Sequence, residues 1–64
     1  MERFLFRVQY IYPDGTTSYE SVCVRAADDD VSAARTQVEE GTERYMKAAR
    51  ATRTLTLLLV TADA

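Results

Sequence analysis

The sequence contains no histidine, no tryptophan and a single cysteine among its 64 residues. That cysteine, Cys23, cannot form an internal disulfide, and without a histidine it lacks both a base to activate it and partners for a zinc site. The three aspartates at positions 28–30 lack the glycine and glutamate spacing of a calcium-binding loop. We therefore expect no enzymatic activity, no bound metal and no cofactor.

Long apolar runs are also absent. The longest run, residues 57–60, is far too short to span a membrane, and Arg3 and Arg7 interrupt the apolar residues near the N-terminus. One free cysteine, no signal-peptide pattern and no membrane contact together predict a cytoplasmic protein. The net charge of −2 at pH 7 lacks the basic excess of a general nucleic-acid binder.

The shortness of the chain points to association. A domain of about 60 residues buries only about 60% of its unfolded surface, so its core is marginal. Small domains compensate with disulfides, a metal or oligomerisation, and the composition leaves only the last of these. We expect one domain over residues 1–64 that binds copies of itself or another protein.

The first half of the chain has the pattern of a β-hairpin. Residues 3–12 alternate with period two and are rich in aromatic and β-branched side chains, which predicts a strand. Pro13-Asp14-Gly15 predicts a three-residue loop with a glycine bulge, followed by a second strand over residues 17–26. This loop sets Phe6 opposite Val22, so that apolar side chains meet across the two strands.

The second half reads as a helix and a strand. The aspartates at 28–30 end the second strand and favour a helix start, because aspartate caps helix N-termini and suits the helix dipole. Residues 31–50 are predicted to be helical, and residues 53–61 form the last strand. We interpret Gly41 as a point where the helix lies close to the sheet, with a kink of the helix as the alternative. The apolar stripe of the helix comprises Val31, Ala34, Val38, Gly41, Tyr45 and Ala48.

These elements predict an α+β fold of ββαβ order. The simplest sheet has three antiparallel strands in the order 2-1-3, with one helix packed on one face through a right-handed crossover. The side chains expected beneath the helix are Phe4, Phe6, Val8, Val22, Val24, Leu55, Leu57 and Leu59.

The last strand is apolar on both faces. Its residues 54–60 read TLTLLLV, so side chains expected away from the helix are also apolar. The strand should also be a sheet edge, without proline or charge over LTLLLV, which either pairs with another chain or is shielded by the helix or by the end of the chain. We therefore predict an interface on this sheet face and edge, ringed by Arg3 and Arg25. Its residues are Leu5, Arg7, Ile11, Tyr19, Cys23, Leu58 and Val60.

Two other surfaces stay open as alternatives. The acidic helix face with Glu39, Glu40 and Glu43 could mimic nucleic-acid phosphates and occupy a basic groove of a partner, or it is simply a solvated face. The arginines of the sheet, together with Tyr19, could instead hold single-stranded nucleic acid. A sheet platform usually presents aromatic side chains on its central strand, whereas here those side chains are expected on the helix side.

The whole layout resembles a group of small phage-encoded proteins. The aromatic hairpin RFLFRVQYIYPDGTTSYESVCVRA, the amphipathic helix and the short last strand are similar in size, acidity and order to several anti-CRISPR proteins. The resemblance covers the whole chain and rests on layout, without a shared motif. It implies an inhibitor that acts in the host cytoplasm by binding a CRISPR-Cas defence complex, without catalysis.

Overall fold

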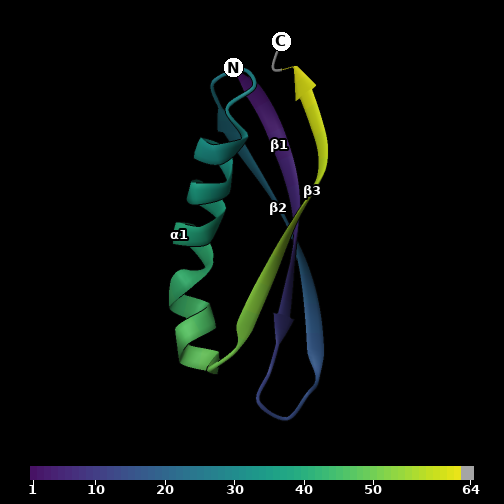
Figure 1. The fold of residues 1–64 in the computed structure, drawn as a ribbon, viewed down its shortest axis with the longest axis vertical. Helices are drawn as coiled ribbons and strands as arrows, with labels where there is room; N and C mark the ends of the chain where they lie inside the picture. The colour runs from purple at the N-terminus through teal and green to yellow at the C-terminus, as the bar shows by residue number, and fades with distance from the viewer. Residues whose placement is uncertain (63–64) are drawn as a thin grey trace.

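The computed structural model describes residues 1–62, which fold as three strands and one helix. The elements are β1 (Glu2–Ile11), β2 (Thr17–Ala26), α1 (Val31–Ala49) and β3 (Thr52–Ala62). The strands form an antiparallel sheet in the order β2-β1-β3, and α1 lies against one face of it (Figure 1). The predicted fold and strand order are confirmed, with strand bounds that differ by one residue.

The hairpin loop forms as its sequence predicts. Tyr12 N–H donates to the Thr16 carbonyl at 2.9 Å, and Gly15 N–H donates to the Tyr12 carbonyl at 2.9 Å. Gly15 has φ = 86°, a left-handed conformation that favours glycine. The loop fixes the register, and Phe6 pairs with Val22 as expected.

The helix is capped at both ends. The Asp30 side chain accepts a hydrogen bond from Ala33 N–H at 3.0 Å, which satisfies one of the donors left free at the helix start. At the other end Arg50 adopts a left-handed conformation with φ = 55°, and its N–H donates to the Lys47 carbonyl at 3.2 Å. The cap at the aspartate run is therefore confirmed.

The core lies between β1 and the helix. Phe4, Phe6 and Val8 are fully buried, and Val38 packs against them from α1. The buried stripe of α1 continues through Thr42, whose hydroxyl donates to the Val38 carbonyl at 2.8 Å and so can be buried without cost.

The expected helix stripe is therefore wrong in its second half. Met46 and Ala49 pack against the core in place of Tyr45 and Ala48. Gly41 is exposed, and a Cβ added there would have nothing within 4 Å, so the expected close approach to the sheet is also wrong.

A β-bulge in β3 corrects the predicted faces of its last residues. Leu57 pairs with Phe6 but Leu59 pairs with Leu5, so Leu58 is an extra residue between them. From this point the alternation is reversed. Leu59, expected beneath the helix, lies on the opposite face, and Val60, expected on the uncovered face, pairs with Phe4 on the helix side.

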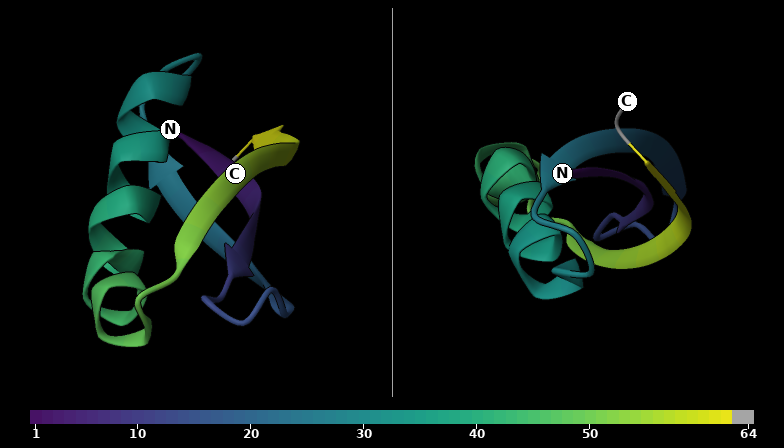
Figure 2. Two further views of the ribbon diagram at one scale, coloured as in Figure 1. Left: turned by 60° about the horizontal axis from the view of Figure 1, so that its bottom comes forward. Right: turned by 90° about the horizontal axis from the view of Figure 1, so that it is seen from above.

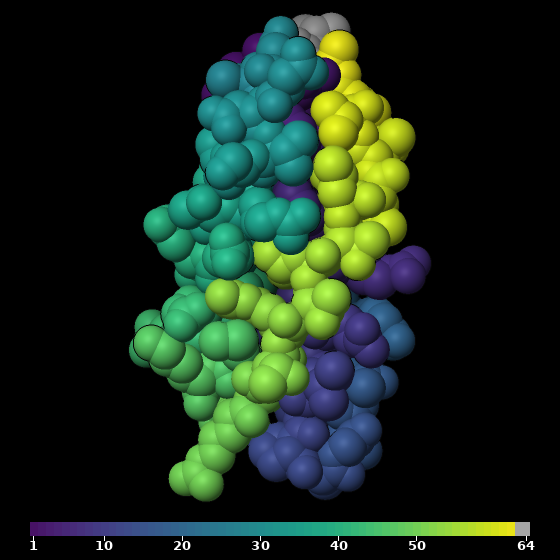
Figure 3. Space-filling model, viewed as in Figure 1, coloured from purple at the N-terminus to yellow at the C-terminus, as the bar shows by residue number. Residues whose placement is uncertain are grey.

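The molecule is elongated, with principal extents of 42 × 17 × 15 Å. The sheet is strongly twisted, and α1 packs chiefly against β2 (Figure 2). The C-terminal half of β3 runs away from the helix along the margin of the molecule (Figures 1 and 3). This half of β3 therefore receives little cover from α1.

Candidate interaction surfaces

Three consecutive apolar residues are exposed at and beyond the bulge of β3. Leu58, Leu59 and Val60 are 43%, 53% and 38% exposed, and we call these three residues the apolar strip. Because Leu59 pairs with Leu5, which in turn pairs with Cys23, the strip continues across the sheet as one apolar row. Cys23 is a free, exposed thiol in this row.

The strip lies on an edge strand that carries little charge. Residues 54–62 contain no ionisable side chain, and the charged residue of β3 is Arg53. Arg53 is already engaged, since its Nη2 lies 3.0 Å from Glu43 and its Nη1 donates to the Glu39 carbonyl at 2.7 Å. Edge strands usually resist association through charge, proline or cover, and the C-terminal half of β3 has the bulge alone.

The rest of the outer face, meaning the sheet face turned away from α1, is mainly polar. Ile11 is 40% exposed there. Arg7 lies over the Tyr19 ring, 5.8 Å from its centroid, and Gln9 Nε2 donates to the Tyr19 hydroxyl at 3.3 Å. The predicted interface is therefore divided by the register: Leu5 and Cys23 join the apolar strip, whereas Arg7, Ile11 and Tyr19 lie in more polar surroundings.

The acidic helix face is also divided. Glu39 and Glu40 are exposed on α1, but Glu43 is paired with Lys47 at 3.3 Å and with Arg53 at 3.0 Å. The hydrogen bond from Lys47 is the main cause that lowers the pKa of Glu43 below its ordinary value, and Arg53 adds to this effect. Glu43 thus ties the helix to β3, which gives it a structural role in addition to any contribution to an acidic surface.

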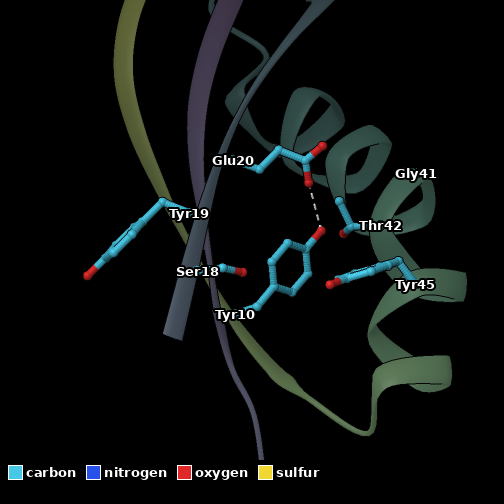
Figure 4. A pocket seen from close by; sticks show the side chains of 7 residues that line it. All are labelled: Tyr10, Ser18, Tyr19, Glu20, Gly41, Thr42 and Tyr45. Atoms are coloured by element: carbon cyan, nitrogen blue, oxygen red, sulfur yellow. Dashed lines mark hydrogen bonds between the residues drawn. The ribbon is translucent and has the colours of Figure 1, made fainter. Parts of the chain in front are cut away.

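A polar cleft between β2 and α1 was not foreseen from the sequence. Its volume is about 390 Å³, and Figure 4 shows side chains from β1, β2 and α1 turned toward one another in it, while Tyr19 points away. The lining residues are Tyr10, Ser18, Tyr19, Glu20, Gly41, Thr42 and Tyr45. A sequence signal did exist, because alternation placed Tyr10 on the helix side and the stripe included Tyr45.

Hydrogen bonds fix the geometry of this cleft. The Tyr10 hydroxyl donates to Glu20 Oε2 at 2.9 Å, and burial, together with this carboxylate, raises the pKa of Tyr10 to about 12. The rings of Tyr10 and Tyr45 meet edge to face, with centroids 4.9 Å apart. The Tyr12 hydroxyl bonds Ser18 Oγ at 2.8 Å and the Tyr45 hydroxyl at 2.6 Å.

The pKa values of the tyrosine hydroxyls in this cluster are shifted in different directions. Hydrogen bonds with Ser18 and Tyr45 lower the pKa of Tyr12, whereas the hydrogen bond with Tyr12 raises the pKa of Tyr45. The raised pKa values keep Tyr10 and Tyr45 protonated at neutral pH, and Tyr10 donates its hydrogen to Glu20. The arrangement directs the hydroxyl hydrogens toward protein acceptors.

Residues 1–62 were compared with the requirements of a metal site and of a membrane-spanning helix. No group of three or more cysteine, aspartate or glutamate side chains in this range could hold a metal ion. Within this range, α1 does not combine the length and apolar character needed to cross a membrane.

No known family profile matches the chain, and no curated protein or solved structure is significantly similar to it.

Proposed function

We propose that this protein is a non-enzymatic protein-binding module whose interface is the β3 edge with the apolar strip. The observation that supports this function is the exposure of three consecutive apolar residues, Leu58, Leu59 and Val60, in the uncharged C-terminal half of an edge strand. Contiguous apolar groups at a sheet edge are typical of strand-to-strand association. The exposed backbone of the edge would supply hydrogen bonds, and the strip would supply apolar contact.

A second copy of the chain is the first occupant to consider. An antiparallel pairing of two β3 strands about a twofold axis near Leu58 brings residues 54–62 of both copies together. Since this segment has no ionisable side chain, no like charges meet in the pair. The sheet would then extend from three to six strands.

Such a dimer should be weak. Full burial of a large aliphatic side chain is worth about 1.5–3 kcal/mol, and the three residues of the strip are already half covered, so each adds roughly 1 kcal/mol. Their twofold-related copies double this sum, while association costs about 4–15 kcal/mol in lost freedom. Apolar burial of about 6 kcal/mol at most slightly exceeds this cost, so a dimer at high micromolar concentration also needs the backbone hydrogen bonds between the two β3 edges, worth about 0.5–1.5 kcal/mol each. Such a weak dimer leaves the edge available to a stronger partner.

A heterologous target gives this edge its biological use. The resemblance to anti-CRISPR proteins makes a bacterial defence complex the expected target, bound through the β3 edge in competition with self-association. Capture of CRISPR-Cas subunits from a host lysate by the wild-type protein, but not by the variant Leu58→Asp, is the expected result. Equal capture by both proteins would move the interface away from β3.

Sedimentation equilibrium tests the edge itself. The wild-type mass should rise from 7.2 kDa toward twice this value between about 10 µM and about 1 mM. Leu58→Asp should remain at 7.2 kDa, because it sets two carboxylates opposite one another across the twofold axis. The matched control is Ser21→Asp on β2, which lies opposite Arg7 and should dimerise like the wild type. A monomeric wild type at the highest concentration would contradict the self-pairing.

Nucleic-acid binding is the second candidate. On the outer face the described strands carry Arg3, Arg7 and Arg25 and no acidic residue, although the chain as a whole is acidic. The Arg7–Tyr19 pair offers a cation beside an exposed ring. Binding of a labelled single-stranded oligonucleotide that weakens with salt and is lost in Arg7→Gln, but kept in the helix control Arg44→Gln, would select this function.

A further inference from the structure

We infer that the cleft between β2 and α1 is a binding site for one organic cation, an alkylammonium or a guanidinium group. The site is separate from the β3 edge, since the cleft lies on the β2 side of the helix (Figure 4). Its volume of about 390 Å³ falls in the range of small ligand sites. The cation could belong to a lysine or arginine side chain of a partner or to a free amine.

The charge of the cleft favours a cation. Glu20 contributes a carboxylate, and no ion pair to this carboxylate forms among residues 1–62. Arg53 donates to Thr42 Oγ1 at 2.9 Å at the wall of the cleft, but its charge is already paired with Glu43 at 3.0 Å. One oxygen of Glu20 accepts from Tyr10, and the other points away from that hydroxyl (Figure 4).

The hydroxyl groups of the cleft favour the same ligand. Tyr10 donates to Glu20, Thr42 donates to the Val38 carbonyl, and the Tyr12 hydroxyl shares hydrogen bonds with the hydroxyls of Ser18 and Tyr45. The hydrogens of Tyr10 and Thr42 are thus used within the protein, and each contact of Tyr12 uses one more. What the cleft offers to a ligand is a carboxylate oxygen, hydroxyl lone pairs and aromatic rings, all of which attract positive charge.

Gly41 keeps this cleft open. It lies inside a helix at a position with no positive φ, and no neighbour would contact a Cβ there. Neither backbone conformation nor packing therefore explains a residue that weakens a helix relative to alanine. Its missing side chain leaves space at the wall of the cleft beside Thr42 and Tyr45.

The test uses amide chemical shifts of the intact protein with paired probes. Butylammonium and ethylguanidinium should shift the amides of Tyr10, Glu20 and Tyr45 in a saturable manner, and neutral pentan-1-ol should not. Equal shifts with pentan-1-ol would mean that the cleft binds apolar chains and would overturn the inference. Shifts spread over the acidic residues of α1, without saturation, would overturn it as well.

Matched variants locate the charge that matters. Glu20→Gln keeps an oxygen that can accept from Tyr10 but loses the charge, and should weaken butylammonium binding about tenfold at low salt. Glu39→Gln makes the same charge change on the β3 side of α1 and should leave the affinity unchanged. Equal affinities of the two variants would contradict the inference.

A further variant tests the opening at Gly41. Gly41→Leu should fold, because the helix position is open, and it should block binding of both cationic probes. Unaltered binding would contradict the role of the cleft.

Further probes identify the source of the cation. Tighter binding of Nα-acetyl-lysine methylamide than of butylammonium would assign the cation to a protein side chain. Tighter binding of spermidine would assign it to a free polyamine, and both results support a cation site.

Discussion

The two edges of the sheet flank the same central strand but are protected differently. At β2, α1 packs alongside, and Gln37 Nε2 of the helix donates to the Arg25 carbonyl at 2.8 Å. At β3, Arg53 ties the beginning of the strand to the helix, but residues 58–62 are uncharged and exposed. One edge is therefore held to the helix by a hydrogen bond near its C-terminal end, and the other has only the bulge at Leu58.

The difference shows what a short chain can and cannot cover. A single helix of 19 residues can lie along one edge of a twisted three-stranded sheet but not along both. The side that it covers also gains the tyrosine cluster and the cleft around Glu20. The other side keeps apolar residues exposed, and association with another chain is the remaining way to bury them.

The difference between the two edges depends on a shared core that holds both outer strands against β1. Substitution of Phe6 in this core should give the largest loss of stability. Phe6 is fully buried on β1 and pairs with Val22 on one side and Leu57 on the other. Phe6→Ala should cost about 3–5 kcal/mol, close to the whole stability of a domain this small. Urea unfolding monitored by circular dichroism measures the loss. A transition close to that of the wild type would show that the core lies elsewhere.

Neighbouring residues of β3 should respond in opposite ways to the same substitution. Leu57→Asp places a carboxylate among the core residues beside Phe6 and should destabilise the fold by about 3 kcal/mol. Leu58→Asp, at the exposed bulge, should leave the monomer folded and abolish association. Circular dichroism and size exclusion on both variants separate fold from association. Unfolding of Leu58→Asp alone would show that the bulge lies at another residue.

Removal of the cover on β2 should make the two edges more alike. Gln37→Ala removes the donor to the Arg25 carbonyl and should cost about 0.5–1.5 kcal/mol, the net value of one hydrogen bond. The variant should also associate more strongly than the wild type, now through β2. Gln37→Lys retains a donor and serves as the control. Unchanged association of Gln37→Ala would mean that the helix body, and not this hydrogen bond, closes the edge.

The smallest expected change in stability concerns the ion pairs of Glu43, which connect α1 to β3. Lys47 and Arg53 lower the pKa of Glu43 below its ordinary value of 4.5, so the folded state binds fewer protons there than the unfolded state. This stabilisation is present above pH 4.5 and is lost as the pH falls through the lower folded pKa. Melting temperatures of wild type and Glu43→Gln should therefore differ at neutral pH and converge in acid. A constant difference would exclude a role for this charge.

Much of the fold could be predicted because local signals agreed with one another. The turn at Pro13-Asp14-Gly15 and the apolar pairs it creates both specify the hairpin register, and the register was confirmed. The bulge could not be predicted, because three consecutive leucines look the same before and after a slip of one residue. The faces assigned to Leu59 and Val60 were wrong for this reason.

The errors on the helix have a different origin. The apolar pattern favoured Gly41 for the stripe, but the structure buries Thr42, whose hydroxyl donates to the Val38 carbonyl. The cleft was missed because Tyr10, Glu20 and Tyr45 come from three elements and meet only when the helix angle is known. The exposed residues of β3 were the part of the interface with a clear local signal, and their role as an interface remains a prediction.

Hydrogen exchange of the two edges at low and high protein concentration tests the central claim most directly. If β3 is the open edge, amides of residues 57–60 should exchange more slowly at about 1 mM than at about 10 µM, while those of residues 19–25 on β2 should not change. The same comparison with Leu58→Asp should show no dependence on concentration at either edge. Protection that rises on β2 instead, or on neither edge while the mass doubles, would contradict the account.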